Sequence, residues 1–142
     1  MTDQERAKAL LYAPDAHNTC VLCKGGEVYA SEKTGIAPMM DLLESGAELS
    51  GFCAADRIVG RAAAMLFVLA QVKEVYAEVI TDGAVQILNE NGIACSWQTR
   101  THMIVNRRGD GPCPMERAVD GVTDPLKARE LIRKTMERLT KK

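Results

Sequence analysis

The hydrophobic positions of the chain recur at helical spacing in some stretches and at strand spacing in others. A capping box at Thr2 and Glu5 precedes a predicted helix over about residues 3–13. Two alternating stretches, residues 19–24 and 27–31, flank a pair of glycines, which predicts a β-hairpin. The chain is therefore expected to begin with a helix and a hairpin.

From residue 35 onward, helical and strand patterns alternate. Strands that alternate with helices are typical of an α/β protein. We predict a three-layer α/β/α sandwich with a mixed sheet. The predicted elements are a helix over 36–45, a strand over 50–55, a helix over 57–70, a strand over 74–80, a helix from Thr81 to a stop at Asn91-Gly92, a strand over 93–103, a helix over 114–119 and a last helix from Asp124-Pro125.

Length and composition narrow the class of protein. The 142 residues are enough for one domain, so a single domain over 1–142 is expected. The 18 basic and 19 acidic residues give a net charge of -1, which argues against bulk nucleic-acid binding. The longest apolar run, residues 62–70, is about half the ~20 residues that cross a bilayer, and the polar start lacks the layout of a secretory signal. We expect a cytoplasmic protein without a membrane partner.

Two positions near the predicted helix over 57–70 are candidates for a site. Asp56 stands where the N-cap of that helix is expected. Gly60 would lie inside the helix, where glycine costs about 1 kcal/mol relative to alanine. Either a backbone or a ligand approaches the first turns closely, or the helix packs tightly on the sheet.

The five cysteines do not indicate a disulfide framework, because their number is odd and their spacing irregular. Cys20 and Cys23 form a C-x-x-C, the spacing of a redox pair or of half a zinc site. However, residues three apart on a strand point to opposite faces, and no second C-x-x-C completes a four-ligand site. A structural role is therefore the favoured interpretation.

A stretch from residue 106 to 116 gathers reactive side chains immediately before a predicted helix. Cys113 precedes the helix start, where unpaired N–H groups and the helix dipole lower the pKa of a thiol. Pro114 suits the first helical position, and Glu116 is placed to reach back to the cap. Cys113 is the candidate reactive cysteine, and Glu116 is a candidate catalytic carboxylate.

The loop residues before Cys113 suggest anion binding. Arg107 and Arg108 provide two guanidinium groups that bind phosphate or carboxylate in a two-pronged manner, and Asn106 precedes them. Gly109 and Gly111 allow a backbone to approach such a ligand closely. The alternative is a well-capped helix preceded by a charged surface loop.

In an open α/β sheet, ligands bind beyond the carboxyl ends of the strands. If the strands are parallel neighbours, the helix starts at Asp56 and Cys113 open on the same edge of the sheet. We expect both residues to belong to one site.

The segment from Pro112 to Glu116 resembles a degraded form of the P-C-x-x-C that opens a zinc-binding helix in cytidine-deaminase-like proteins. The order of predicted elements is also similar to that fold. More closely, the chain resembles a small family of uncharacterised prokaryotic proteins, a domain of unknown function with a deaminase-like fold. The residues that carry this resemblance are Thr19–Leu22, Ala55–Ala63, Lys73–Ala77 and Asn106–Glu116.

The chain departs from zinc deaminases at the metal site. Such an enzyme needs H-x-E or C-x-E at one helix start and two cysteines at the other. Neither His17 nor His102 is followed by x-Glu, and Glu116 occupies the position of the second cysteine. We therefore expect no zinc and no cofactor.

Our prediction from sequence is a deaminase-like domain that binds a small anionic ligand, such as a nucleotide, through the 106–116 stretch and the two helix starts. Asp56 and Glu116 would accept hydrogen bonds from the ligand. One alternative is an enzyme that uses Cys113 as nucleophile or redox thiol, with Asp56 or Glu116 as proton carrier. Another is a protein-interaction module. Whether there is catalysis, and the oligomeric state, stay open.

Overall fold

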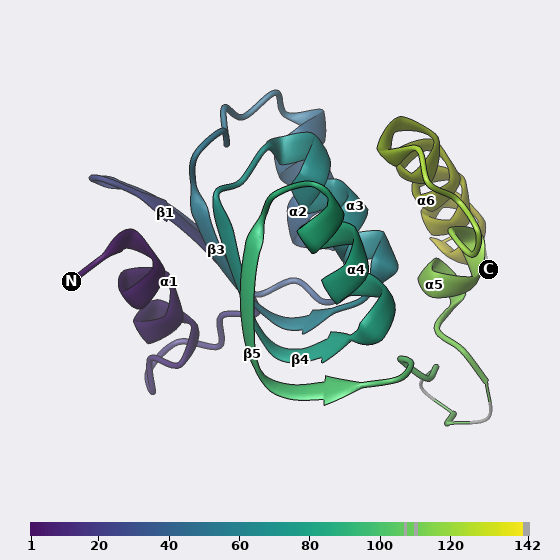
Figure 1. The fold of residues 1–142 in the computed structure, drawn as a ribbon, viewed down its shortest axis with the longest axis horizontal. Coiled ribbons are helices and arrows are strands. Elements are labelled where there is room, and N and C mark those ends of the chain that lie inside the picture. Colours follow the sequence, from purple (N-terminus) through teal and green to yellow (C-terminus); the bar gives the residue numbers. More distant parts are fainter. Residues whose placement is uncertain (107, 110, 141–142) are drawn as a thin grey trace.

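The chain folds into a mixed five-stranded sheet with helices on both faces (Figure 1). This computed structural model describes residues 1–106, 108–109 and 111–140. The elements in chain order are α1 (Asp3–Leu11), β1 (Cys20–Lys24), β2 (Glu27–Ser31), α2 (Ala37–Glu44), β3 (Cys53–Val59), α3 (Arg61–Ala70), β4 (Glu74–Thr81), α4 (Asp82–Glu90), β5 (Ala94–Thr101), α5 (Pro114–Ala118) and α6 (Pro125–Thr140). The predicted α/β class and mixed sheet are confirmed.

The strand order is β2-β1-β3-β4-β5. β1 runs antiparallel to both β2 and β3, whereas β3, β4 and β5 are parallel to one another. The predicted hairpin is therefore confirmed as the antiparallel part of the sheet. The carboxyl ends of β3, β4 and β5 lie at one edge, where α3 and α4 begin.

The two faces of the sheet are covered unequally. α1 lies on one face, where Ala7 and Leu11 pack against Val21, Ala55 and Tyr76. α2, α3 and α4 cover the other face, and α6 packs outside α3 (Figure 1). α3 is apolar on nearly all sides because it lies between the sheet and α6, as expected for a central helix.

The prediction for residues 56–60 is wrong. Asp56 and Arg57 belong to β3, and α3 begins at Arg61 with Gly60 as its N-cap. Asp56 pairs with Cys20 on one side and Ala77 on the other, so its backbone is part of the central ladder. Asp56 and Arg57 resembled a helix start only because these two polar residues precede a long apolar run.

Several local predictions are confirmed. Thr81 caps α4 by accepting a hydrogen bond of 3.1 Å from the N–H of Ala84. Gly92, with φ of 71°, follows the end of that helix. Cys20 belongs to the larger core beneath α3, whereas Cys23 packs on the α1 side, so the two thiols point to opposite faces. Both are free.

The last helix, α6, is buried through Ala128 and Ile132, as the pattern predicts. Leu139, near the end of this helix, is 40% exposed. Within the described residues, none of the helices is both long and apolar enough to cross a bilayer.

Candidate functional site

The chain folds back over the carboxyl edge of the sheet after β5. The N–H of Cys113 donates a 2.9 Å hydrogen bond to the carbonyl oxygen of Ile104, and Val105 forms a β-bridge with Pro112. The described residues 104–106 and 111–113 thus pair as the base of a small irregular hairpin that leads directly into α5. This arrangement places Cys113 and α5 next to the start of α3.

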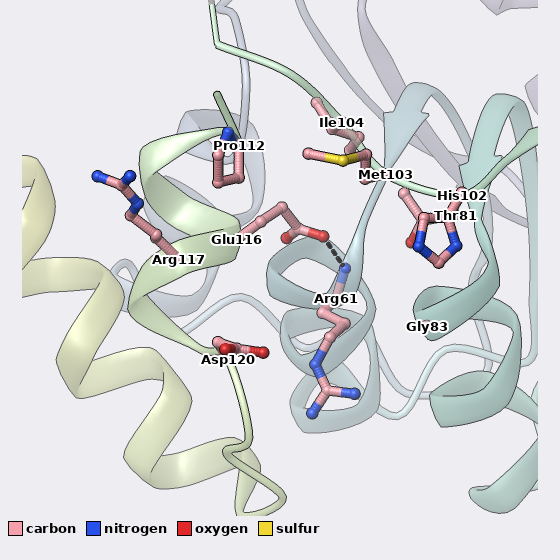
Figure 2. A pocket seen from close by; sticks show the side chains of 10 residues that line it. All are labelled: Arg61, Thr81, Gly83, His102, Met103, Ile104, Pro112, Glu116, Arg117 and Asp120. Carbon is pink, nitrogen blue, oxygen red and sulfur yellow. Dashed lines mark hydrogen bonds between the residues drawn. The ribbon is translucent and has the colours of Figure 1, made fainter. Parts of the chain in front are cut away.

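Glu116 on α5 caps the start of α3 (Figure 2). Its Oε1 accepts a 2.7 Å hydrogen bond from the N–H of Arg61, and its Oε2 accepts one of 2.8 Å from the N–H of Ala62. The first N–H groups of a helix have no partner in the helix and bind anions well. At α3 that anion is a carboxylate of the same chain.

Gly60 makes this close approach possible. A Cβ atom at Gly60 would lie 2.2 Å from Oε1 of Glu116 and 2.7 Å from Cδ1 of Ile104, which is closer than real contacts allow. The φ of Gly60 is -105°, so the backbone itself does not require glycine. The group that approaches Gly60 closely is the Glu116 side chain, which is neither the backbone or ligand nor the packing on the sheet considered from the sequence.

A cavity of about 290 Å³, here called the Asp56 cavity, opens beside this contact. It brings together Asp56, Gly60, Cys113 and Glu116, four of the residues predicted to form a site. Most of its wall is apolar. The apolar lining includes Ile36, Ile58, Ala62, Ala63, Ile104 and Met115.

Asp56 is the buried polar group of this cavity, with only 6% of its surface exposed. Burial raises the pKa of its carboxyl from 3.8 to about 7, although hydrogen bonds from the N–H groups of Arg57 and Ile58 act in the opposite direction. A carboxyl with a pKa near neutrality exchanges its proton readily at physiological pH. Asp56 can therefore act as an acceptor or as a donor toward a bound molecule.

Cys113 is half-buried and lines the same cavity. Cys53 does not join it, because Cys53 begins β3 and pairs with Cys23 and Glu74 at the opposite end of the strand. The thiol that the site can use is therefore that of Cys113.

A second cavity of about 300 Å³ lies on the other side of Glu116 and Ile104 (Figure 2). The Arg61 guanidinium points away from Glu116, and its Nη2 donates a 2.6 Å hydrogen bond to the carbonyl oxygen of Val122. His102 on the opposite wall is exposed, with Nδ1 3.5 Å from a carboxylate oxygen of Asp82. Glu116 and Ile104 thus separate the Asp56 cavity from a second cavity whose lining includes Arg61, Arg117 and Asp120.

The remaining predicted residues that the structure describes, Asn106, Arg108, Gly109 and Gly111, belong to the segment between Ile104 and Cys113. The N–H of Asn106 donates a 2.7 Å hydrogen bond to Gly111, and Gly109 adopts a φ of 75° in the turn. Arg108 is exposed, and Arg107 lies outside the described residues. Asn106, Arg108, Gly109 and Gly111 are absent from the lining of both cavities. The backbone conformation of Gly109 is one that favours glycine, which explains this residue by the turn alone.

Ile58, Ile104 and Met115 also line the Asp56 cavity and were not predicted as site residues from the sequence. Ile58 follows Asp56 by two positions, and a strand period extended through Val59 would have placed both on one face. Ile104 and Met115 are brought there by the hairpin and α5, and no local pattern indicates that contact.

The similarity of the chain to known proteins agrees with this fold. Residues 8–136 match the family model TM1506, a domain of unknown function (DUF1893). The crystal structure of a DUF1893 family protein (TM1506) from Thermotoga maritima has a TM-score of 0.81 and 24% sequence identity to this chain. The similarity covers 97% of this chain and 91% of that chain, and at this identity it shows the fold alone.

No curated protein matches the sequence. The resemblance to an uncharacterised family is confirmed, and neither similarity names a cytidine deaminase, so that part of the resemblance stays a prediction.

Proposed function

This chain belongs to the DUF1893 family, whose function is unknown, and we propose a function from the carboxyl edge of the sheet. We propose that the domain binds a small nitrogen-containing molecule, the size of one heterocyclic ring system, in the Asp56 cavity. The observation that carries this proposal is a buried carboxyl of raised pKa in a cavity with mostly apolar walls. Such a combination is typical of small-molecule sites.

The chemistry of the cavity defines the class of ligand. An amino or amidine group would donate hydrogen bonds to ionised Asp56, and apolar walls such as Ile58 and Met115 would contact the ring. Exclusion of water strengthens such a hydrogen bond. The volume of about 290 Å³ favours a compact ligand over an extended one. An amino-bearing nucleobase meets these requirements.

The predicted anionic ligand fits this cavity only in part. Among the described residues, the N–H groups of Arg61 and Ala62 already bind Glu116, and Asp56 itself would repel a second negative charge. We therefore place the anionic part of a nucleotide outside the cavity, near the exposed Arg108 on the hairpin. The base would enter the Asp56 cavity.

Calorimetry with nucleobases, nucleosides and their monophosphates tests the proposal. Compounds with an exocyclic amino group should bind, and Asp56→Asn should weaken their binding by about tenfold or more, because a charged hydrogen bond is lost. Asp15→Asn is the matched control, since Asp15 is exposed in a loop. Failure of every compound to bind, or equal affinity in the Asp56→Asn protein, would count against the proposal.

A second candidate is thiol chemistry at Cys113. It is favoured because Asp56 and Cys113 line the same cavity, and the pKa of Asp56, about 7, suits a proton acceptor near neutrality. Mass spectrometry of iodoacetamide labelling would compare Cys113 with Cys95, which is also half-buried. We expect faster labelling of Cys113 and a slower rate after Asp56→Asn. Equal rates for both cysteines would remove this candidate.

A further inference from the structure

A groove between α5 and α6 combines positive charge with an apolar floor. It has a volume of about 670 Å³, and we call it the cationic groove. Arg117 comes from α5, and Lys134 and Arg138 come from α6. Leu131 and Leu139 contribute apolar surface. The groove is lined by Pro114, Arg117 and Ala118 of α5, whereas Met115 and Glu116 of the same helix line the Asp56 cavity, so the two sites use different residues of α5.

The three cations of the groove have no acidic partner within the described part of the chain. Arg117, Lys134 and Arg138 are absent from the ion pairs of residues 1–106, 108–109 and 111–140. Arg133 on the same helix behaves differently, because it pairs with Glu44 at 3.0 Å and with Glu130 at 2.7 Å. The described lining of the groove holds three positive charges and no carboxylate.

The apolar floor follows from the spacing of α6. Leu131, Thr135 and Leu139 recur every four residues and so share one face of the helix, with Lys134 and Arg138 beside them. Leu139 is 40% exposed and Leu131 is half-buried. The groove thus offers the accessible parts of two leucines next to three positive charges, a combination that suits an acidic amphipathic partner.

We propose that the cationic groove binds an acidic amphipathic segment of another protein. Leucine-like side chains of the segment would pack on Leu131 and Leu139, and its carboxylates would pair with Arg117, Lys134 and Arg138. An amphipathic helix that lies in a groove between two helices is a common mode of peptide recognition. Complementary charge would select an acidic partner and speed its association. This function does not depend on a ligand in the Asp56 cavity.

Fluorescence anisotropy with synthetic peptides and the full chain tests the proposal. The probe is a helix-forming peptide of leucine and glutamate, and its counterpart replaces every glutamate with lysine. The acidic peptide should bind and the basic one should not. Lys134→Glu with Arg138→Glu should weaken binding by about tenfold or more. Lys127→Glu, an exposed α6 position outside the groove, should leave the affinity unchanged.

Three results would overturn the proposal. One is equal binding of the acidic and basic peptides, and another is undiminished binding by the double variant. The third is binding to anionic phosphatidylglycerol vesicles but not to the acidic peptide, which would indicate a lipid surface. Circular dichroism confirms that each variant is folded, and Lys134→Gln with Arg138→Gln provides a milder variant in which the same loss of affinity is expected.

Discussion

Replacing Gly60 with alanine would test how the carboxyl edge is held together. A Cβ atom at this position would lie 2.2 Å from Oε1 and 2.5 Å from Cδ of Glu116. The Glu116 side chain is flexible, but it can move away only by giving up its hydrogen bonds to the N–H groups of Arg61 and Ala62. Cδ1 of Ile104, at 2.7 Å, would have to move as well.

The loss of stability has two sources, namely the broken hydrogen bonds of Glu116 and the forced shift of Ile104. Loss of a helix cap costs about 1 kcal/mol, and a forced shift in a packed region adds about 1 kcal/mol or more. We therefore expect Gly60→Ala to lower the free energy of unfolding by ~2 kcal/mol. Because the backbone at Gly60 has a φ of -105°, alanine adds no backbone strain there, so the loss reports the contact with Glu116 and Ile104.

Urea denaturation measures this loss as a shift of the midpoint at constant slope. A double-mutant cycle with Glu116→Ala separates the contact from other effects. In the Glu116→Ala background the hydrogen bonds are already gone, so Gly60→Ala should cost clearly less. A loss below about 0.5 kcal/mol in the wild-type background, or strictly additive losses, would refute the role of Glu116 as a cap.

Three further predictions concern Asp56, Thr81 and Arg57. Burial raises the pKa of Asp56 from 3.8 to about 7, so the protonated carboxyl stabilises the fold fully below about pH 4, and this stabilisation is lost as pH rises through about 7. Asp56→Asn should remove this pH dependence of the free energy of unfolding and stabilise the protein at about pH 8, as denaturation at a series of pH values would show. Thr81→Ala should cost about 1 kcal/mol in urea, because the buried cap of α4 is lost. Arg57→Lys should lower the free energy of unfolding by about 1–2 kcal/mol, because the guanidinium donates hydrogen bonds to the carbonyl of Leu11 and to Glu78 simultaneously. Thermal melts at constant pH would show this loss as a lower melting temperature.

Local features of the fold could be predicted from the sequence because their causes are local. The glycine turn between β1 and β2, the Thr81 cap and the stop at Gly92 each depend on residues close in sequence. Strand alternation likewise placed Cys20 and Cys23 on opposite faces of the sheet. These predictions needed no knowledge of tertiary contacts.

The error at Asp56 has a tertiary cause. An aspartate before an apolar helical run fits an N-cap, and nothing nearby shows that β1 and β4 pair with the backbone on either side of it. The same pairing buries the carboxyl and raises its pKa. The sequence therefore assigned Asp56 to the wrong element, and its role as a site residue stays a prediction.

Glu116 shows the same limit at longer range. Its position predicted a carboxylate that reaches back to the cap of its own helix, whereas it binds the start of α3, 55 residues earlier in the chain. That contact also explains Gly60, whose role was open between close approach and tight packing. The contact between Glu116 and the start of α3 depends on the packing of α5 against α3, which no local sequence pattern indicates.

The account depends most directly on Asp56 as a buried carboxyl in a cavity. Carbon-13 NMR of the Asp56 carboxyl across pH would measure its titration, with Asp56→Asn used to assign the resonance. The account predicts a midpoint at about 7, which an amino-bearing ligand in the cavity would lower. A midpoint near the ordinary aspartate value of ~3.9 would contradict it, because Asp56 would then be an ordinary solvated carboxylate.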